Sequence, residues 1–178
     1  MERMILVNEL DQETGYGEKL AVHQEGLLHR AFSVFLWRED RLLLQKRALV
    51  KYHSGGLWAN TCCSHPRPGE EIIPAARRRL QEECGIVSPP LYEAFSFIYR
   101  AELAGGLWEH EFDHVLLGHY PKGSFSPDPD EIAELRWWSL EELDRALARQ
   151  EEIFAPWFKL CAPRVISLLQ QHNSDIIS

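Results

Sequence analysis

The sequence predicts an α/β (α+β) domain in which a mixed β-sheet is sandwiched between helices. Strand-like stretches occur before and after one charged, helix-like segment, and two more helix-like segments close the chain. The composition, 45% apolar and 26% charged residues, indicates a globular protein. A chain of 178 residues buries roughly two-thirds of its unfolded surface. We therefore expect one domain over residues 1–178, with layers packed around the sheet.

The N-terminal part is predicted to form strands joined by turns. Residues 4–8 indicate a short strand, 11–17 a turn-rich connection, and 18–23 a short extended or helical piece. Apolar side chains alternate along residues 31–38, and residues 41–47 have a second strand pattern. The two residues between these strands fit a tight turn, so the pair is predicted to be a hairpin.

A helix and two long strands are expected in the middle of the chain. A loop with two prolines, residues 66–69, precedes a helix that tolerates Pro74 in its first turn. Gly85 supplies the left-handed residue that ends this helix. Strands over 91–101 and 108–119 then flank an Ala-Gly-Gly connection.

The C-terminal part is predicted to contain a strand and two helices. After a loop over 121–129, residues 134–139 have a strand pattern. The run Ser139-Leu-Glu-Glu is typical of a capping box and opens a helix to Arg149. A last helix follows the Ala-Pro-Trp sequence and is expected to end near His172.

Charge and cysteine usage exclude several classes of protein. The formal net charge of −8 disfavours nucleic acid or an anionic membrane as a partner, because dense basic surfaces bind both. The N-terminus has no signal-peptide pattern, and no segment reaches the roughly 18 apolar residues that span a bilayer, so we expect a cytoplasmic protein. Adjacent Cys62 and Cys63 do not suit a disulfide framework, and a reducing compartment would keep the four cysteines free. The absence of a Cys-x-x-Cys spacing disfavours a zinc ribbon or a thioredoxin-type motif.

Two segments place reactive side chains two residues apart, the spacing that aims both at one face of a strand. Cys63 and His65 form the first pair, and Glu109 and Glu111 form the second. By the same parity Cys62 points away from His65, so Cys63 is the candidate for chemistry. A thiol, an imidazole and two carboxylates that meet in one cavity would form a metal-assisted proton-transfer site.

A second interpretation of the carboxylates needs no cation. If their strand face lies in solvent, with Trp108, Phe112 and Leu116 in the core, the like charges are simply hydrated. If that face is buried, the carboxylates need a cation to neutralise them. The burial of the face therefore decides between the two.

The central helix matches a damaged version of the Nudix box, Gly-x5-Glu-x7-Arg-Glu-U-x-Glu-Glu-x-Gly-U, in which U is aliphatic. The matching residues are Glu70, Arg78, Leu80, Glu82, Glu83, Gly85 and Ile86. Ser64 stands at the first glycine, and Arg79 replaces a glutamate that holds magnesium in the intact box. The alternative is a solvated, charged helix face with no metal role.

With these residues in place, the chain resembles the type I isopentenyl-diphosphate isomerases, which have the Nudix fold, over residues 3–160. Four segments carry the resemblance: Leu-His-Arg-Ala-Phe-Ser at 28–33, Gln-Lys-Arg-Ala at 45–48, Trp-Ala-Asn-Thr-Cys-Cys-Ser-His-Pro at 58–66, and Trp-Glu-His-Glu-Phe-Asp at 108–113. It implies conversion of isopentenyl to dimethylallyl diphosphate in isoprenoid biosynthesis, by protonation at C4 and deprotonation at C2. It implies no flavin.

The resemblance implies one divalent metal, Mn²⁺, Mg²⁺ or Zn²⁺, held by His23, His29, His65, Glu109 and Glu111. Such a mixture of imidazoles and carboxylates suits these ions, and six-coordination would leave one position open or taken by a second carboxylate oxygen. Taken alone, His23 and His29 have no diagnostic spacing and are ordinary surface or core histidines.

The resemblance also implies the groups that move protons. Glu111 would handle the proton at C4 with help from Tyr99, and Cys63 would be the opposing base at C2. A thiolate base needs a local cation or dipole to lower a thiol pKa that is ordinarily near 8.5. Trp157 would form an aromatic wall beside the cationic intermediate, although on sequence alone it fits a core position.

The diphosphate would be bound by basic residues. By resemblance these are Lys19, Arg47, Lys51 and Arg79, and Glu83 would hold a second Mg²⁺ that bridges the diphosphate. Each residue alone is equally typical of a surface charge. The expected partner is a small prenyl diphosphate, with no nucleic acid or membrane, and the expected assembly is a monomer or a homodimer.

Two other functions compete with the isomerase. A Nudix hydrolase would cleave a diphosphate, but Arg79 occupies the position of a metal-binding glutamate of that motif. A non-catalytic protein that binds prenyl diphosphates would be expected to have lost Cys63 or Glu111, and both are present.

Overall fold

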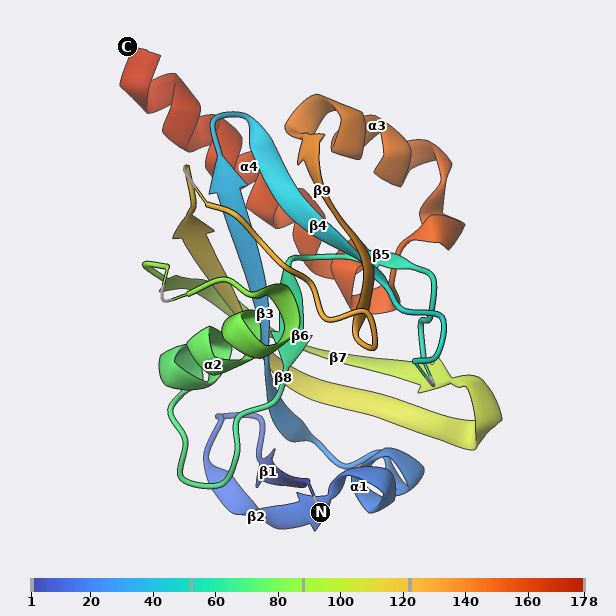
Figure 1. Cartoon of the computed structure of the whole chain (residues 1–178). Helices are drawn as coiled ribbons and strands as arrows, with labels where there is room; N and C mark the ends of the chain where they lie inside the picture. The colour runs from blue at the N-terminus through green and yellow to red at the C-terminus, as the bar shows by residue number, and fades with distance from the viewer. Residues whose placement is uncertain (1, 52, 88, 122, 178) are drawn as a thin grey trace.

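The computed structural model describes residues 2–51, 53–87, 89–121 and 123–177, and it has the predicted α+β class (Figure 1). Its strands are β1 (Arg3–Val7), β2 (Glu13–Glu18), β3 (His29–Arg38), β4 (Arg41–Arg47), β5 (Trp58–Ala59), β6 (Cys62–Ser64), β7 (Tyr92–Leu103), β8 (Leu107–His119) and β9 (Ile132–Ser139). Its helices are α1 (Lys19–Glu25), α2 (Ile72–Cys84), α3 (Leu140–Arg149) and α4 (Pro156–Ile177), with 3₁₀ turns at Ala104–Gly106 and Glu151–Ile153.

Strand β3 is the centre of the mixed sheet. It pairs in parallel with β8 along its whole length, from His29 opposite Glu111 to Trp37 opposite His119. Along its other edge, β3 pairs successively with β1, β6 and β4, and all three pairings are antiparallel. The ends of β3 and β8 that carry His29 and Glu111 therefore lie side by side, next to the short strand β6.

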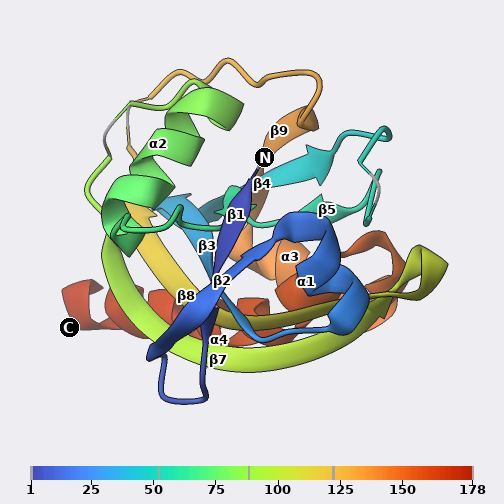
Figure 2. The ribbon, with the colours of Figure 1, turned by 90° about the horizontal axis from the view of Figure 1, so that it is seen from below.

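Two apolar cores cover the two faces of the sheet. Alternate residues of β3 separate between them: Phe35 packs in the core that includes α3 and α4, while Phe32 and Val34 pack in the core under α2. Figure 2 shows α2 and α4 on opposite sides of the sheet. This is the sandwich that the alternating pattern predicts.

Several predicted elements are confirmed. The hairpin of β3 and β4 closes at Arg38 opposite Arg41, and α2 ends at Gly85 in the left-handed conformation, with φ of 65°. A side chain at that position would meet the backbone of Ser126 within 2.9 Å. At the start of α3, the Ser139 hydroxyl accepts a hydrogen bond of 3.0 Å from the backbone N–H of Glu142, as in a capping box.

Two elements differ from the prediction. The connection expected over 11–17 is mostly strand β2, because pairing with β1, for example Ile5 opposite Tyr16, overrides the local turn preference. The last helix, expected to end near His172, continues to Ile177. The Ser174 hydroxyl donates to the carbonyl of Gln170 and so bonds within the helix, where the sequence favoured a stop.

The N-terminal strands and α1 lie at one end of the sheet, beside the ends of β3 and β8 (Figure 1). Gly26 ends α1 in the left-handed conformation, with φ of 64°, and the chain enters β3 three residues later at His29. None of the described helices is both long and apolar enough to cross a membrane.

Candidate active site

A cavity of about 610 Å³ opens beside this end of the sheet. The predicted site residues in its wall are Lys19, Arg47, Lys51, Cys63, His65, Arg79, Glu83, Tyr99, Glu109, Glu111 and Trp157. His23 and His29 do not line the cavity. They are buried behind it, at 1% and 0% exposure, with the His29 ring centroid 5.0 Å from that of His65. The fold thus gathers the predicted residues from distant parts of the chain.

The carboxylate face of β8 is buried, which excludes the solvated interpretation. Glu109 is 3% exposed, Glu111 is 7% exposed, and Asp113 is fully buried on the same face. Asp113 lies outside the cavity wall and accepts a hydrogen bond of 2.7 Å from the Ser33 hydroxyl. Burial, and then the nearby Glu111 charge, raise the pKa of Asp113 well above its usual value.

His23, His29, His65, Glu109 and Glu111 form what we call the histidine–carboxylate cluster. The Nδ1 of His23 lies 2.7 Å from the Lys19 carbonyl, and the Nδ1 of His29 lies 2.9 Å from the Leu27 carbonyl. Because a carbonyl can only accept, each Nδ1 carries a proton and each Nε2 remains a potential metal ligand. Backbone contacts of this kind orient metal-binding histidines.

Glu111 is at the centre of the cluster. Its Oε1 lies 3.1 Å from His65 Nε2 and 3.6 Å from His29 Nε2, and its Oε2 accepts a 2.9 Å hydrogen bond from Tyr99. Although burial alone would raise it, the contacts with His29 and His65 hold the pKa of Glu111 well below its usual range. Burial lowers the pKa of His65 to about 4, which keeps this ring neutral at physiological pH.

The pKa of Glu109 is shifted in the opposite direction to that of Glu111. Burial, and then the neighbouring Glu111 carboxylate, raise its pKa well above the usual value. Its Oε2 is buried and makes no hydrogen bond to any part of the chain that the structure describes. The buried Glu109 carboxylate therefore lacks a donor at Oε2, and a bound cation would stabilise its charged form.

Among the residues that the structure describes, two groups of three side chains could hold a metal ion: His29, His65 and Glu111, and His23, His53 and Glu109. In each group the ligand atoms lie within 4.8 Å of one another. Sequence reasoning missed His53 because it lies between β4 and β5, outside any alternating strand pattern. Its Nε2 is 3.7 Å from Glu109 Oε1.

The two adjacent cysteines lie in different environments, as the parity argument predicts. Cys62 is fully buried in the core under α2, where its thiol lies 3.6 Å from Glu83 Oε2. Cys63 lines the cavity. Its thiol donates to Asn60 Oδ1 at 3.4 Å, and the same oxygen accepts a 3.0 Å bond from Trp157 Nε1.

Asn60 was also missed by sequence reasoning. It is fully buried, and its Nδ2 donates to the carbonyls of Val34 and Cys62 at 3.1 and 2.8 Å. With Oδ1 accepting from Cys63 and Trp157, this amide fixes both residues relative to the sheet. The only sequence signal was its place in the strand-like segment that carries Cys63.

The electrostatics of Cys63 correct one expectation. A local cation was expected to lower the pKa of the thiol, but burial raises it above its usual value, and the Arg47 charge opposes this rise without reversing it. Burial therefore favours the neutral thiol of Cys63 over the thiolate. Arg47 is itself buried and lies 5.2 Å from the centre of the Trp157 ring.

Lys19, Lys51 and Arg79 form the basic rim of the cavity, with side chains 36%, 25% and 23% exposed. Each is already paired with an acid: Lys19 with Glu2 at 3.2 Å, Lys51 with Glu131, and Arg79 with Glu82 and Glu83. Burial raises the pKa of Glu83 despite the attraction of Arg79. An anionic ligand would compete with these acids for the same cations.

The chain is similar to known proteins over most of its length. A family model described as the NUDIX domain matches residues 27–160. Isopentenyl-diphosphate Delta-isomerase 2 of Aromatoleum aromaticum is 50% identical, over 93% of this chain and 87% of that protein. Isopentenyl-diphosphate Delta-isomerase of Photobacterium profundum is 47% identical, over 94% of this chain and 96% of that protein.

Solved structures show the same fold at lower sequence identity. DR0079 from Deinococcus radiodurans is 20% identical, with a TM-score of 0.73 over 92% of this chain and 98% of that one. A MutT NUDIX hydrolase from Burkholderia pseudomallei is 24% identical, with a TM-score of 0.56 over 65% of this chain and 85% of that one.

Proposed function

We propose that this chain, which belongs to the isopentenyl-diphosphate Delta-isomerases of the NUDIX family, converts isopentenyl diphosphate to dimethylallyl diphosphate. One observation supports this most strongly: Cys63 and the pair of Tyr99 and Glu111 line the same cavity as the basic rim. A 1,3-proton shift needs one group to deliver a proton and another to remove one, beside a site for the diphosphate.

The histidine–carboxylate cluster is proposed to hold a divalent cation, Mn²⁺, Mg²⁺ or Zn²⁺. The donor set fits, since the cluster offers imidazole nitrogens fixed by backbone carbonyls and two buried carboxylates. When bound, the cation would neutralise the two carboxylates and strengthen the acidity of groups that contact it. Tyr99 then orients Glu111 through its hydrogen bond to Oε2.

The proton steps are assigned to Cys63, Tyr99 and Glu111, which line the cavity. Glu111, assisted by Tyr99, is assigned the proton that C4 of the substrate gains, and Cys63 removes a proton from C2, so that the double bond moves from C3–C4 to C2–C3. Because the contacts with His29 and His65 favour the ionised form of Glu111 and burial favours the neutral thiol of Cys63, Glu111 must take up a proton and Cys63 must lose one before these steps. Arg47 is the nearby cation whose charge favours the thiolate. Trp157 offers its ring face to positive charge, as its contact with Arg47 indicates.

The diphosphate is assigned to the basic rim and Arg47. Lys19, Lys51 and Arg79 would exchange their present acid partners for phosphate oxygens. Glu83, released from Arg79, would then hold a Mg²⁺ that bridges the diphosphate. No flavin is required, because the substrate and product have the same oxidation state.

Cleavage of the diphosphate is the competing function. It is disfavoured because Arg79 places a guanidinium against Glu83, at the point of α2 where the intact box would supply a further metal-binding carboxylate. This arrangement supports binding of a diphosphate without its hydrolysis.

The deciding experiment is ¹H NMR of isopentenyl diphosphate with the purified protein and Mg²⁺ or Mn²⁺ in D₂O. We expect dimethylallyl diphosphate that carries deuterium from the solvent. Release of inorganic phosphate or isopentenyl monophosphate would contradict the proposal in favour of a hydrolase. Unchanged substrate in the presence of measurable binding would favour a non-catalytic binding protein.

A further inference from the structure

His53 lies in the cavity wall, but none of the roles proposed above uses it. It follows β4 in the same segment as Lys51, and its side chain is only 11% exposed. The five metal ligands implied by family resemblance do not include this residue. Its position at the edge of the histidine–carboxylate cluster therefore needs an explanation of its own.

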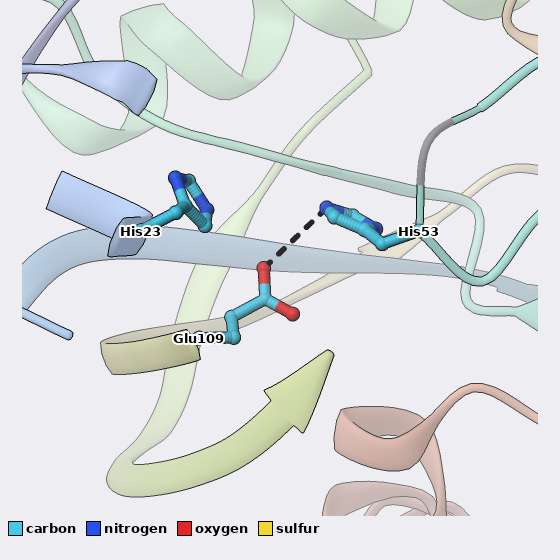
Figure 3. A group of neighbouring side chains, drawn as sticks. All are labelled: His23, His53 and Glu109. Carbon is cyan, nitrogen blue, oxygen red and sulfur yellow. Dashed lines mark ion pairs between the residues drawn. The ribbon is translucent and has the colours of Figure 1, made fainter. Parts of the chain in front are cut away.

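The geometry around His53 is that of a ligand group. Its ring and that of His23 lie on either side of Glu109, and one carboxylate oxygen points between the two rings (Figure 3). The three ligand atoms lie within 4.8 Å of one another. Two atoms that each bond one ion at about 2.1 Å lie at most about 4.2 Å apart, so small side-chain rotations bring the three into bonding distance.

Glu109 supplies an independent reason for a cation at this place. Its carboxylate is 3% exposed, and its Oε2 makes no hydrogen bond within the residues that the structure describes. A buried carboxylate oxygen without a donor is unfavourable unless a cation or a proton satisfies it. Imidazole and carboxylate together suit Zn²⁺, Co²⁺ and Mn²⁺.

We propose that His53, with His23 and Glu109, ligates a divalent cation. This inference rests on the proposed metal centre and extends it, because His53 supplies a donor beyond the five of the cluster. His29, His65 and Glu111 form a separate group of three. The added donor, His53, therefore lies next to Glu109 and His23 and is not part of that group.

A different arrangement of the same residues involves no ion. Arg47 Nη2 lies 3.3 Å from His53 Nδ1 and can only donate. If Nδ1 accepts this bond, the ring proton lies on Nε2 and faces Glu109, and His53 only links Arg47 to that carboxylate. As a ligand, His53 would instead carry its proton on Nδ1 and direct the Nε2 lone pair to the ion. Only in the second arrangement does the side chain at position 53 contact the ion, so only then should a cysteine at this position bind the ion through its sulfur.

The test is a titration of the metal-free protein with Co²⁺, without substrate, followed by calorimetry and visible absorption. His53→Gln is expected to weaken binding at least about tenfold, the smallest loss that even an outer partner of a ligand causes, and to change the Co²⁺ absorption. His119→Gln, which alters an exposed histidine outside the cavity, is the matched control and should bind like the unaltered protein. Unchanged affinity and spectrum in His53→Gln would overturn the proposal.

Two further variants distinguish a failure of this inference from a failure of the proposed metal centre. His53→Cys should add an intense near-ultraviolet charge-transfer band on Co²⁺ binding, since a thiolate would then ligate the ion directly. Absence of that band in a folded variant would count against His53 as a ligand. His29→Gln should weaken Co²⁺ binding whether or not His53 is a ligand. If the unaltered protein binds no Co²⁺, the proposed metal centre itself fails. If it binds and only His53→Gln has no effect, this inference alone fails.

Discussion

The histidine–carboxylate cluster and the basic rim lie in or behind the wall of one cavity, yet they are stabilised in different ways. In the cluster, buried acceptors outnumber donors, and the protein responds by shifting pKa values: that of Glu109 rises and that of Glu111 falls. In the rim, the cations are partly exposed and paired with acids. The buried acceptors of the cluster thus favour binding of a cation. The cations of the rim are neutralised by neighbouring acids until an anionic ligand displaces those acids.

The sharpest way to test the cluster is to remove one carboxylate charge. Glu111→Gln should lower the turnover number by at least about 10³-fold, within the range typical of a general acid, and should also weaken metal binding. NMR rates and metal titration measure the two effects. Asp113→Asn is the control on the same strand face, because Asp113 lies outside the cavity wall. Full activity in Glu111→Gln would contradict the assignment.

The next variant separates proton transfer from metal binding. Cys63→Ala should lower turnover by about 10²- to 10⁴-fold while leaving metal affinity and folding nearly unchanged, since its thiol contacts Asn60 and none of the cluster ligands in the described structure. Cys62→Ser should remain active. An inactive but folded Cys62→Ser variant would show that the wrong member of the adjacent pair had been chosen.

The pKa values of two buried histidines predict how the metal-free protein responds to acid. Burial lowers the pKa of His65 to about 4 and that of His53 to about 3. The neutral rings are thus favoured on folding. Their contribution to the free energy of unfolding is complete above the usual histidine pKa of 6.5 and is lost as the pH falls through these folded values. Protonating such a ring in the folded protein costs about 1.4 kcal/mol for every pH unit by which burial lowers its pKa.

Chemical denaturation of the metal-free protein at pH 7, 5 and 4 measures this loss. His65→Gln should have a weaker dependence on pH over that interval, whereas the rim variant Lys51→Gln should keep the original dependence. Equal pH dependence in His65→Gln and the unaltered protein would mean that the buried rings do not control acid stability.

The smallest expected effect is that of a substitution beside the basic rim. Glu131→Gln removes an acid that pairs with Lys51 and Arg79, so the substrate diphosphate no longer has to displace it. We expect KM to fall by up to about fivefold, the worth of a half-exposed ion pair, with kcat unchanged. Steady-state kinetics measures both. Glu141→Gln, which breaks a pair with Arg145 outside the cavity wall, should leave KM as it is.

The sequence by itself determined the elements that depend on local patterns. Alternation in β8 put Glu109 and Glu111 on one face, parity separated Cys63 from Cys62, and Gly85 ended α2. Resemblance in four segments identified the family, and the NUDIX match and the curated relatives confirm it. These features could be read because a strand or helix repeats with a fixed period and a motif has a fixed spacing.

Only the tertiary structure decided what depends on long-range pairing. Strand β2 forms because β1 lies beside it, although its residues have turn character. Burial of the carboxylate face, the raised pKa of the Cys63 thiol, and the roles of Asn60 and His53 all depend on which distant residues surround each group. His53 and Glu109 are separated by more than fifty residues in the sequence. Their contact therefore leaves no local periodic pattern from which it could be predicted. Free energies of burial and charge depend on the assembled surroundings, so they were fixed only when the chain folded.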